Sequence, residues 1–308
     1  MKVAFCFPGQ GSQAPGMGKE FAEQLPAVRE VYASASEAAG FDVAEACFSG
    51  SVEELTDTRV QQPALVATSI ACLRAIEETG LRPDAVVGYS VGEYAALAAC
   101  GAIDVAGAIE LVRERGIAMA QVAEQHPGSM AAIIGLDDSV VEELCTSIEG
   151  VWPANYNCPG QVVVSGEAES ITELLEVASE RGARRVVPLR VSGAFHTPLV
   201  SGVADHLGPF LAAAAWQEPT VSFVSTVTAA FEDKTAIPRV LEEQLAGPVL
   251  FTQAVQTLRE SGIDTFVEVG PGKVLSGLVK RCDRTVTAVS VGDLESLASL
   301  EATLGARA

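Results

Sequence analysis

The chain has few basic residues, few histidines and no closely spaced cysteine pair. It carries 20 Lys and Arg against 40 Asp and Glu, a formal net charge of −20 over 308 residues. Such an acidic protein repels nucleic-acid phosphates, so we expect no nucleic-acid partner. The 7 cysteines are an odd number, widely scattered and without a CxxC motif. This pattern predicts neither a disulfide framework nor a metal site, and it favours the reducing cytoplasm.

Long apolar runs are also missing. No segment approaches the roughly 18 uninterrupted apolar residues of a membrane helix, so we expect no membrane partner. At the N-terminus one lysine precedes an apolar stretch that stops at Pro8, which is too short for a signal peptide and predicts a buried first strand. With 48% hydrophobic residues, the chain can bury a large core.

Apolar strand patterns alternate with longer helical patterns, which predicts an α/β fold with a mostly parallel sheet. Strands are expected at 3–7 and 85–87, and Pro63 is expected to open a helix that Gly80 closes. After residue 126 the pattern becomes βαββαβ, the ferredoxin-like plan. We therefore predict a large catalytic domain formed by residues 1–126 and 191–308. Residues 127–190 would form a small domain inserted into it. The small domain's strands are expected at 130–136, 151–155, 162–165 and 185–189, and its helices at 139–148 and 171–181.

The most informative motif is GYSVGE at residues 88–93. A GxSxG sequence between a strand and a helix marks a sharp turn that exposes the central serine, and glycine is needed at both flanks because a Cβ would collide with neighbouring backbone. The helix that follows aims its free N–H groups at the reaction site. Ser90 is therefore the candidate nucleophile. A helix-capping serine is the structural alternative, and GxSxG alone leaves it about equally open.

Two other motifs flank this turn. GQGSQA at 9–14 superficially resembles a dinucleotide fingerprint, but Pro15 and Gly16 interrupt the helix that such a site requires, so we expect no cofactor. GAFHTP at 193–198 contains His196, one of 3 histidines. A lone histidine is usually structural, yet serine is a poor nucleophile until an imidazole takes its proton. His196 is therefore the favoured base.

Taken in order, seven motifs resemble the signature of malonyl-CoA:acyl carrier protein transacylases. They are FPGQGSQ (7–13), QPA (62–64), GYSVGE (88–93), RG (115–116), NYNCPGQ (155–161), FHTP (195–198) and EVGPGK (268–273). The resemblance covers nearly the whole chain, and several motifs in order are far more specific than any one of them. It implies an α/β-hydrolase-like large domain with a ferredoxin-like insert. It also implies malonyl-CoA and an acyl carrier protein, through its phosphopantetheine arm, as partners.

The resemblance also implies the catalytic residues. Ser90 would be acylated, and His196 would act first as general base and then as general acid. The backbone carbonyl of Gln244 would orient the imidazole, where a hydrolase uses a carboxylate. The backbone N–H groups of Gln10 and Val91 would form the oxyanion hole.

Two further residues would select the substrate. The resemblance assigns Arg115 to the free carboxylate of malonate, because a planar guanidinium matches a carboxylate in two parallel hydrogen bonds. Without the resemblance, an ordinary helix-surface arginine is the better interpretation. Phe195 resembles the residue of malonyl-selecting acyltransferases, in which a ring fills the space that an α-methyl group would need.

Departures from the family pattern leave the pathway open. Tyr89 stands where most relatives carry histidine, and Val91 where many carry leucine, which puts the local hydrogen bonding at the turn in question. A similar turn occurs in malonate decarboxylase transacylase subunits, and similar histidine motifs occur in polyketide acyltransferases. A serine thioesterase is less favoured, because no histidine follows His206. The joint presence of Ser90, His196 and Arg115 argues against a non-catalytic docking subunit.

Basic residues gather in two clusters, which are Arg181, Arg184, Arg185 and Arg190, and Lys273, Lys280, Arg281 and Arg284. An acidic carrier protein would need such a local positive face on an acidic enzyme. A solvated charged surface is an equally favoured alternative from sequence alone.

Overall fold

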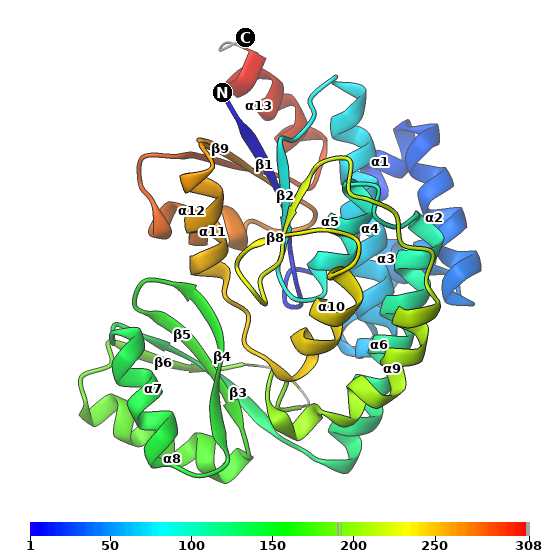
Figure 1. The fold of residues 1–308 in the computed structure, drawn as a ribbon. Coiled ribbons are helices and arrows are strands. Elements are labelled where there is room, and N and C mark those ends of the chain that lie inside the picture. The colour runs from blue at the N-terminus through cyan, green and yellow to red at the C-terminus, as the bar shows by residue number, and fades with distance from the viewer. Residues whose placement is uncertain (190, 192, 306–308) are drawn as a thin grey trace.

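Two β-sheets organise the chain in the computed structural model, which describes residues 1–189, 191 and 193–305 (Figure 1). The larger sheet has the strand order β10-β9-β1-β2-β7-β8. Its neighbouring strands are all parallel except the β7–β8 pair. The predicted mostly parallel α/β sheet is confirmed. The strands are β1 (Val3–Phe7), β2 (Ala85–Gly88), β7 (Ser222–Val224), β8 (Phe231–Glu232), β9 (Thr265–Val269) and β10 (Thr287–Val291).

Helices cover both faces of this sheet, which explains why its central strand β1 is apolar throughout. Alternate β1 side chains enter different cores: Phe5 and Phe7 join one, and Cys6 joins the other. The first core is packed by α1 (Lys19–Gln24), α2 (Pro26–Ala39), α3 (Val43–Ser49), α4 (Thr58–Glu78), α5 (Gly92–Ala99), α6 (Val105–Gln125), α9 (Gly202–Ala213), α10 (Ile237–Ala246) and α13 (Leu294–Gly305). The second core is packed by α11 (Phe251–Glu260) and α12 (Val274–Cys282).

The smaller sheet is antiparallel, with the order β4-β5-β3-β6 and a core of its own. Numbered along the chain, its strands run 2-3-1-4, which is the ferredoxin-like arrangement and confirms that expectation. Its elements are β3 (Ser129–Ile134), α7 (Asp138–Ser147), β4 (Val151–Cys158), β5 (Gln161–Gly166), α8 (Ala168–Glu180) and β6 (Arg185–Pro188). The domain limits at 126/127 and 190/191 stay a prediction, and Arg190 lies outside the described residues.

The helix expected to open at Pro63 begins earlier, so that prediction was wrong. Helix α4 starts at Thr58, where the Asp57 side chain accepts a hydrogen bond from the backbone N–H of Arg59. Pro63 lies inside the helix, where it removes a single backbone donor, and the cap upstream sets the start instead. Gly80 follows the last turn with a positive φ of 85°, which agrees with the predicted end.

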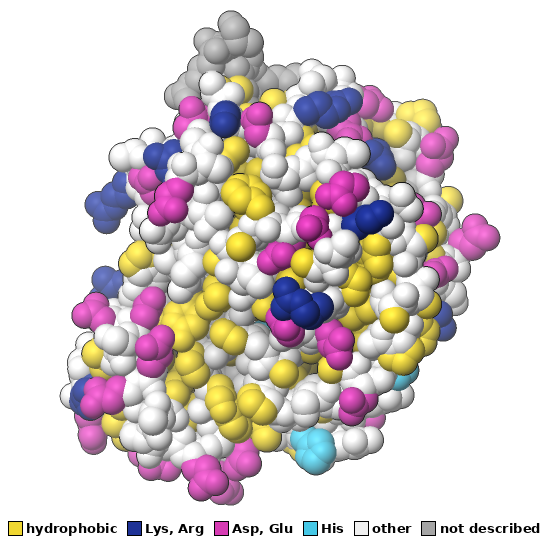
Figure 2. All heavy atoms as spheres, viewed as in Figure 1, with side chains coloured by type: hydrophobic (Ala, Val, Ile, Leu, Met, Phe, Trp, Pro, Cys, Tyr) yellow, Lys and Arg dark blue, Asp and Glu magenta, His cyan; other side chains and the backbone are white. Residues whose placement is uncertain are grey.

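Acidic residues outnumber basic ones by 40 to 20 in the chain. On the face shown in Figure 2, Asp and Glu side chains are dispersed and the basic side chains stand among them. None of the helices in the described part of the chain is long and apolar enough to cross a membrane.

Candidate active site

The GxSxG turn joins β2 to α5 and places Ser90 at the carboxyl end of the central strands. Ser90 has a φ of 52°, a left-handed conformation that is rare outside glycine and that the surrounding structure must enforce. A Cβ at Gly88 would lie 2.1 Å from the backbone N of Glu93, and one at Gly92 would lie 2.2 Å from the carbonyl oxygen of Phe7. Both flanks therefore have to be glycine, as the motif predicts.

His196 lies against Ser90 although 106 residues separate them along the chain. Its Nε2 is 2.8 Å from Ser90 Oγ. Its Nδ1 lies 2.9 Å from the carbonyl oxygen of Gln244 and 3.2 Å from that of Gly247, where α10 ends. Because carbonyl oxygens only accept, Nδ1 carries the proton and the lone pair of Nε2 faces the serine hydroxyl.

The surroundings of His196 keep its imidazole neutral. Burial, helped by the positive charge of Arg115, lowers the pKa of His196 to about 4, although the carbonyls of Gln244 and Gly247 act in the opposite direction. An unprotonated base near neutral pH can take the serine proton. The carbonyls at the end of α10 also stabilise the imidazolium that then forms.

Arg115 projects from α6 into the same site and is 2% exposed. Its Nη2 donates to Ser90 Oγ at 3.2 Å and to Gln244 Oε1 at 3.3 Å, and its Nη1 donates to Gln62 Oε1 at 2.9 Å. No Asp or Glu of the described residues forms an ion pair with it, and its Nε has no hydrogen-bond partner among them. The helix-surface alternative for Arg115 was wrong. The site contains a buried cation whose protein acceptors are all uncharged.

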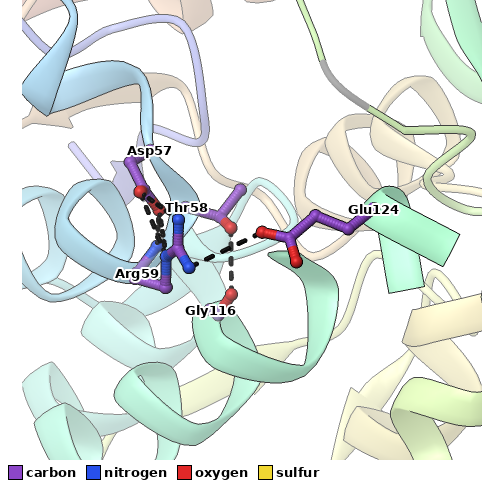
Figure 3. A network of polar contacts seen from close by, with 5 residues as sticks. All are labelled: Asp57, Thr58, Arg59, Gly116 and Glu124. Atoms are coloured by element: carbon purple, nitrogen blue, oxygen red, sulfur yellow. Dashed lines mark hydrogen bonds and ion pairs between the residues drawn. The ribbon is translucent and has the colours of Figure 1, made fainter. Parts of the chain in front are cut away.

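The next residue, Gly116, explains how Arg115 is placed. Figure 3 shows Gly116 facing the start of α4, where Thr58 Oγ1 donates to the Gly116 carbonyl oxygen at 2.9 Å. A Cβ at Gly116 would lie 2.4 Å from the Thr58 carbonyl oxygen. The same corner is held by ion pairs from Arg59 to Asp57 at 2.7 Å and to Glu124 at 3.6 Å. Close approach of α6 to α4 therefore brings Arg115 beside Gln62, one turn further along α4.

A pocket of about 280 Å³ opens in front of Ser90 and His196. The loops after β1 and β2 and the strands β3, β4 and β5 of the smaller sheet contribute to it. Its apolar part contains Met119, Met130, Ala132, Val163, Leu189, Val191, Phe195, Val274, Leu275 and Leu278. Phe195 is 3% exposed and lines this pocket next to the histidine. The backbone N–H groups of Gln10 and Val91 donate to no acceptor in the described part of the chain, so both are free to bind an oxyanion.

Tyr89 contacts two other parts of the chain at this turn. Its hydroxyl donates to Asn157 Oδ1 at 2.6 Å, and its ring packs edge-on against Phe251 with ring centres 5.6 Å apart. Asn157 belongs to β4, so this contact ties the serine turn to the smaller sheet.

Gln62 and Glu93 belong to two of the sequence motifs, but the motifs predict no role for either side chain. In the structure, Gln62 binds Arg115 and Glu93 lies fully buried behind the serine turn. Gly247, the second acceptor for His196, lies outside every motif, and no sequence signal identifies it.

Three basic residues from the two predicted clusters come together. Arg184, Arg185 and Arg281 line a cavity of about 380 Å³ with Gln161, which also lines the Ser90 pocket. None of the three arginines has an ion-pair partner among the described residues. Of the other described members of the two clusters, none lines this cavity; they are Arg181, Lys273, Lys280 and Arg284. Arg181 pairs with Glu143, Lys280 donates to the Val286 carbonyl, Lys273 lines a different groove, and Arg190 is outside the described residues.

Comparison with known proteins agrees with this fold and site. A family model described as an acyl transferase domain matches residues 4–300, and the chain belongs to this family. A malonyl CoA-acyl carrier protein transacylase from Bacillus subtilis is 43% identical over 301 residues, which cover 96% of this chain and 95% of the relative.

Solved structures agree equally well. The malonyl-CoA:acyl carrier protein transacylase of Xanthomonas oryzae superposes with a TM-score of 0.94 at 41% identity, covering 98% of this chain and 99% of that one. A chain from the holo complex of a type II PKS acyl-carrier protein with its malonyl-transacylase has a TM-score of 0.94 at 38% identity, covering 97% of this chain and 98% of that one.

Proposed function

We propose that this chain is an acyl-carrier-protein S-malonyltransferase, which moves a malonyl group from malonyl-CoA to the phosphopantetheine thiol of an acyl carrier protein. The observation that carries the proposal is a buried guanidinium, without an acidic partner among the described residues, 3.2 Å from the hydroxyl of Ser90. An acyl group on Ser90 that ends in a carboxylate would supply the missing anion. The relatives named malonyl CoA-acyl carrier protein transacylase support the same substrate.

Acylation follows from the geometry at Ser90. His196 Nε2 takes the hydroxyl proton as Ser90 Oγ attacks the thioester carbonyl. The N–H groups of Gln10 and Val91 would bind the oxyanion, and such a donor contributes about 2.7 to 4 kcal/mol because the charge grows only in the transition state. The C–S bond then breaks, and protonated His196 gives its proton to the departing CoA thiolate.

Transfer to the carrier repeats these steps in reverse. The carrier thiol gives its proton to His196 and attacks the malonyl ester, and the C–O bond to Ser90 breaks as His196 returns the proton to Ser90 Oγ. Two substrates thus use one site in turn, which is ping-pong kinetics. The carbonyl acceptors of His196 differ from the acidic triad member of a thioesterase, which disfavours that alternative.

The arginine-lined cavity is our proposed contact for the carrier protein. Arg184 and Arg185 come from the smaller-sheet region and Arg281 from α12, so the cavity lies where the two parts of the chain meet. Arg281 donates to Gln161, which also faces the Ser90 pocket. A phosphate on a pantetheine arm that enters this pocket would pass these cations.

The pathway and compartment complete the proposal. Fatty acid synthesis is the assignment we favour, with polyketide synthesis and malonate decarboxylation as the alternatives. All 7 cysteines are free thiols, which supports a cytoplasmic location.

Intact-mass measurement after mixing with malonyl-CoA tests the function. We expect one malonyl adduct that maps to Ser90 and disappears when a holo acyl carrier protein is added. Ser90→Ala is the matched control and should stay unmodified. An unmodified wild-type protein, or an adduct that persists in Ser90→Ala, would refute the assignment.

A further inference from the structure

We infer that Glu93 and the side-chain amide of Gln244 form a polar relay that holds Arg115 in its carboxylate-binding position. The inference rests on the proposed role of Arg115. It gives Glu93 a positioning role and gives Gln244 a second role beside the backbone carbonyl that orients His196.

The amide of Gln244 lies between the buried guanidinium of Arg115 and the buried carboxyl group of Glu93. Its Oε1 accepts from Arg115 Nη2 at 3.3 Å, and its Nε2 donates to Glu93 Oε2 at 2.6 Å and to the Ser90 carbonyl oxygen at 3.2 Å. Gln244 and Glu93 are 0% exposed and Arg115 is 2% exposed, so little water competes for these contacts. The amide dipole is aligned with its oxygen toward the guanidinium and its nitrogen toward the carboxyl group.

Glu93 decides which way this amide points. Its Oε1 is held by the backbone N–H of Thr226 at 2.5 Å, by the Thr226 hydroxyl at 2.8 Å and by the Ser225 hydroxyl at 3.1 Å. These donors leave Oε2 facing Gln244. Burial raises the pKa of Glu93 to about 7 while the hydrogen bonds from Thr226 and Ser225 oppose the shift, and in the ionised form Oε2 can only accept from Gln244. If the Gln244 amide were reversed, its oxygen would face Glu93 and its N–H groups would face the guanidinium.

Arg115 depends on the amide because the contact is charge-assisted and buried. It has one other neutral side-chain acceptor besides the serine, Gln62 Oε1 at 2.9 Å. Losing the Gln244 acceptor would leave Nη2 with the serine hydroxyl as its one protein acceptor among the described residues, and would let the guanidinium turn away from Ser90. His196 would be little affected, because its partner is the backbone carbonyl of Gln244.

Glu93→Gln tests the relay. The donors of Thr226 and Ser225 require an oxygen at the Oε1 position, so the new amide must present N–H groups to Gln244. Gln244 then reverses and presents its own N–H groups to Arg115. We expect the preference for malonyl-CoA over acetyl-CoA in Ser90 acylation to fall at least about tenfold, mainly through KM for malonyl-CoA, since a hydrogen bond to a charged group is lost. Labelling of Ser90 by phenylmethylsulfonyl fluoride, a neutral reagent, should change little.

A double substitution separates an effect on the relay from a general loss of stability. In Glu93→Gln with Gln244→Glu, the charge count is unchanged, position 93 donates to position 244, and position 244 accepts from Arg115. We expect a thermal midpoint nearer to wild type than that of Glu93→Gln, and a low malonyl preference because Arg115 is now neutralised by protein. Glu110→Gln, an exposed position on α6, is the control for loss of one acidic charge.

The outcomes separate the relay from the proposed function. If Arg115→Ala lowers the malonyl preference but Glu93→Gln and the paired variant both keep the wild-type value, the relay is wrong and the function stands. If Arg115→Ala also keeps the preference, the assigned role of Arg115 fails and the relay fails with it. A loss of serine labelling equal to the loss of malonyl preference would show that Glu93 only supports the fold.

Discussion

Replacing Arg115 by alanine tests whether a single guanidinium selects acyl groups that end in a carboxylate. In the structure this group is 2% exposed, its Nη2 is 3.2 Å from Ser90 Oγ, and its side-chain acceptors are the hydroxyl and two amide oxygens. A malonyl group on Ser90 would bring a carboxylate to it. An acetyl group would leave the buried cation without an anion.

The size of the effect follows from this burial. Removing one partner of a buried ion pair costs about 3 to 5 kcal/mol, because the other charge is left uncompensated. At about 1.36 kcal/mol per tenfold change in rate, this corresponds to roughly a hundredfold or more in the malonyl-to-acetyl ratio. The lower end applies, because water can enter the space that the long side chain vacates. We therefore expect the wild-type preference to fall by about a hundredfold in Arg115→Ala.

The assay is competition between malonyl-CoA and acetyl-CoA for Ser90, followed by intact mass at short times. Arg113→Ala is the matched control, because Arg113 lies on the same helix with a side chain 43% exposed and an ion pair to Glu114. It should keep the wild-type ratio. If Arg115→Ala keeps that ratio as well, another residue holds the carboxylate and the reasoning from burial is refuted.

Four further outcomes are expected. Because the pKa of His196 is lowered to about 4, the acylation rate should stay constant from neutral pH down to about pH 5 and fall as the pH drops through 4. In Arg115→Ala this fall should begin at higher pH, since a positive charge near the imidazole is gone. A pH–rate profile of each protein checks both expectations. Phe195→Ser should raise methylmalonyl-CoA use relative to malonyl-CoA by roughly 10- to 200-fold in a competition assay, and an unchanged ratio would remove Phe195 from the selection of the acyl group. The double variant Arg184→Glu with Arg281→Glu should raise KM for the carrier protein and weaken the salt dependence of that KM, while self-acylation by malonyl-CoA, the control, stays unchanged. Carrier kinetics equal to those of the wild type would show that the carrier protein does not bind at this cavity. Gly116→Ala should lower both the thermal midpoint and the malonyl preference, because a Cβ there would lie 2.4 Å from the Thr58 carbonyl oxygen at the start of α4. A loss of stability alone would mean that the position of Arg115 does not depend on this contact.

Local patterns in the sequence predict much of the fold because they act over short distances. Glycines at 88 and 92 are required by contacts within and next to the turn itself, so the GxSxG motif identifies the serine before any tertiary contact is known. The βαββαβ order follows from hydrophobic periodicity, which reports which face of each element is buried. Pro63 shows where such reasoning fails, because a cap six residues upstream decided the start of α4.

The site itself depends on contacts between distant segments. Ser90 and His196 are 106 residues apart, and the Gln244 amide reaches Glu93 across 151 residues and Ser90 across 154. No periodicity encodes such pairs. The motifs themselves indicate Ser90 and His196, whereas the roles of Gln244, Arg115 and the two oxyanion donors came from the resemblance to a family. Whether Arg115 lies at the surface or in the site was decided by the packing of α6 against α4. Local patterns thus specify the serine turn and the order of elements. Which charges are buried together depends on the folded chain, because burial is set by what distant segments place around each side chain.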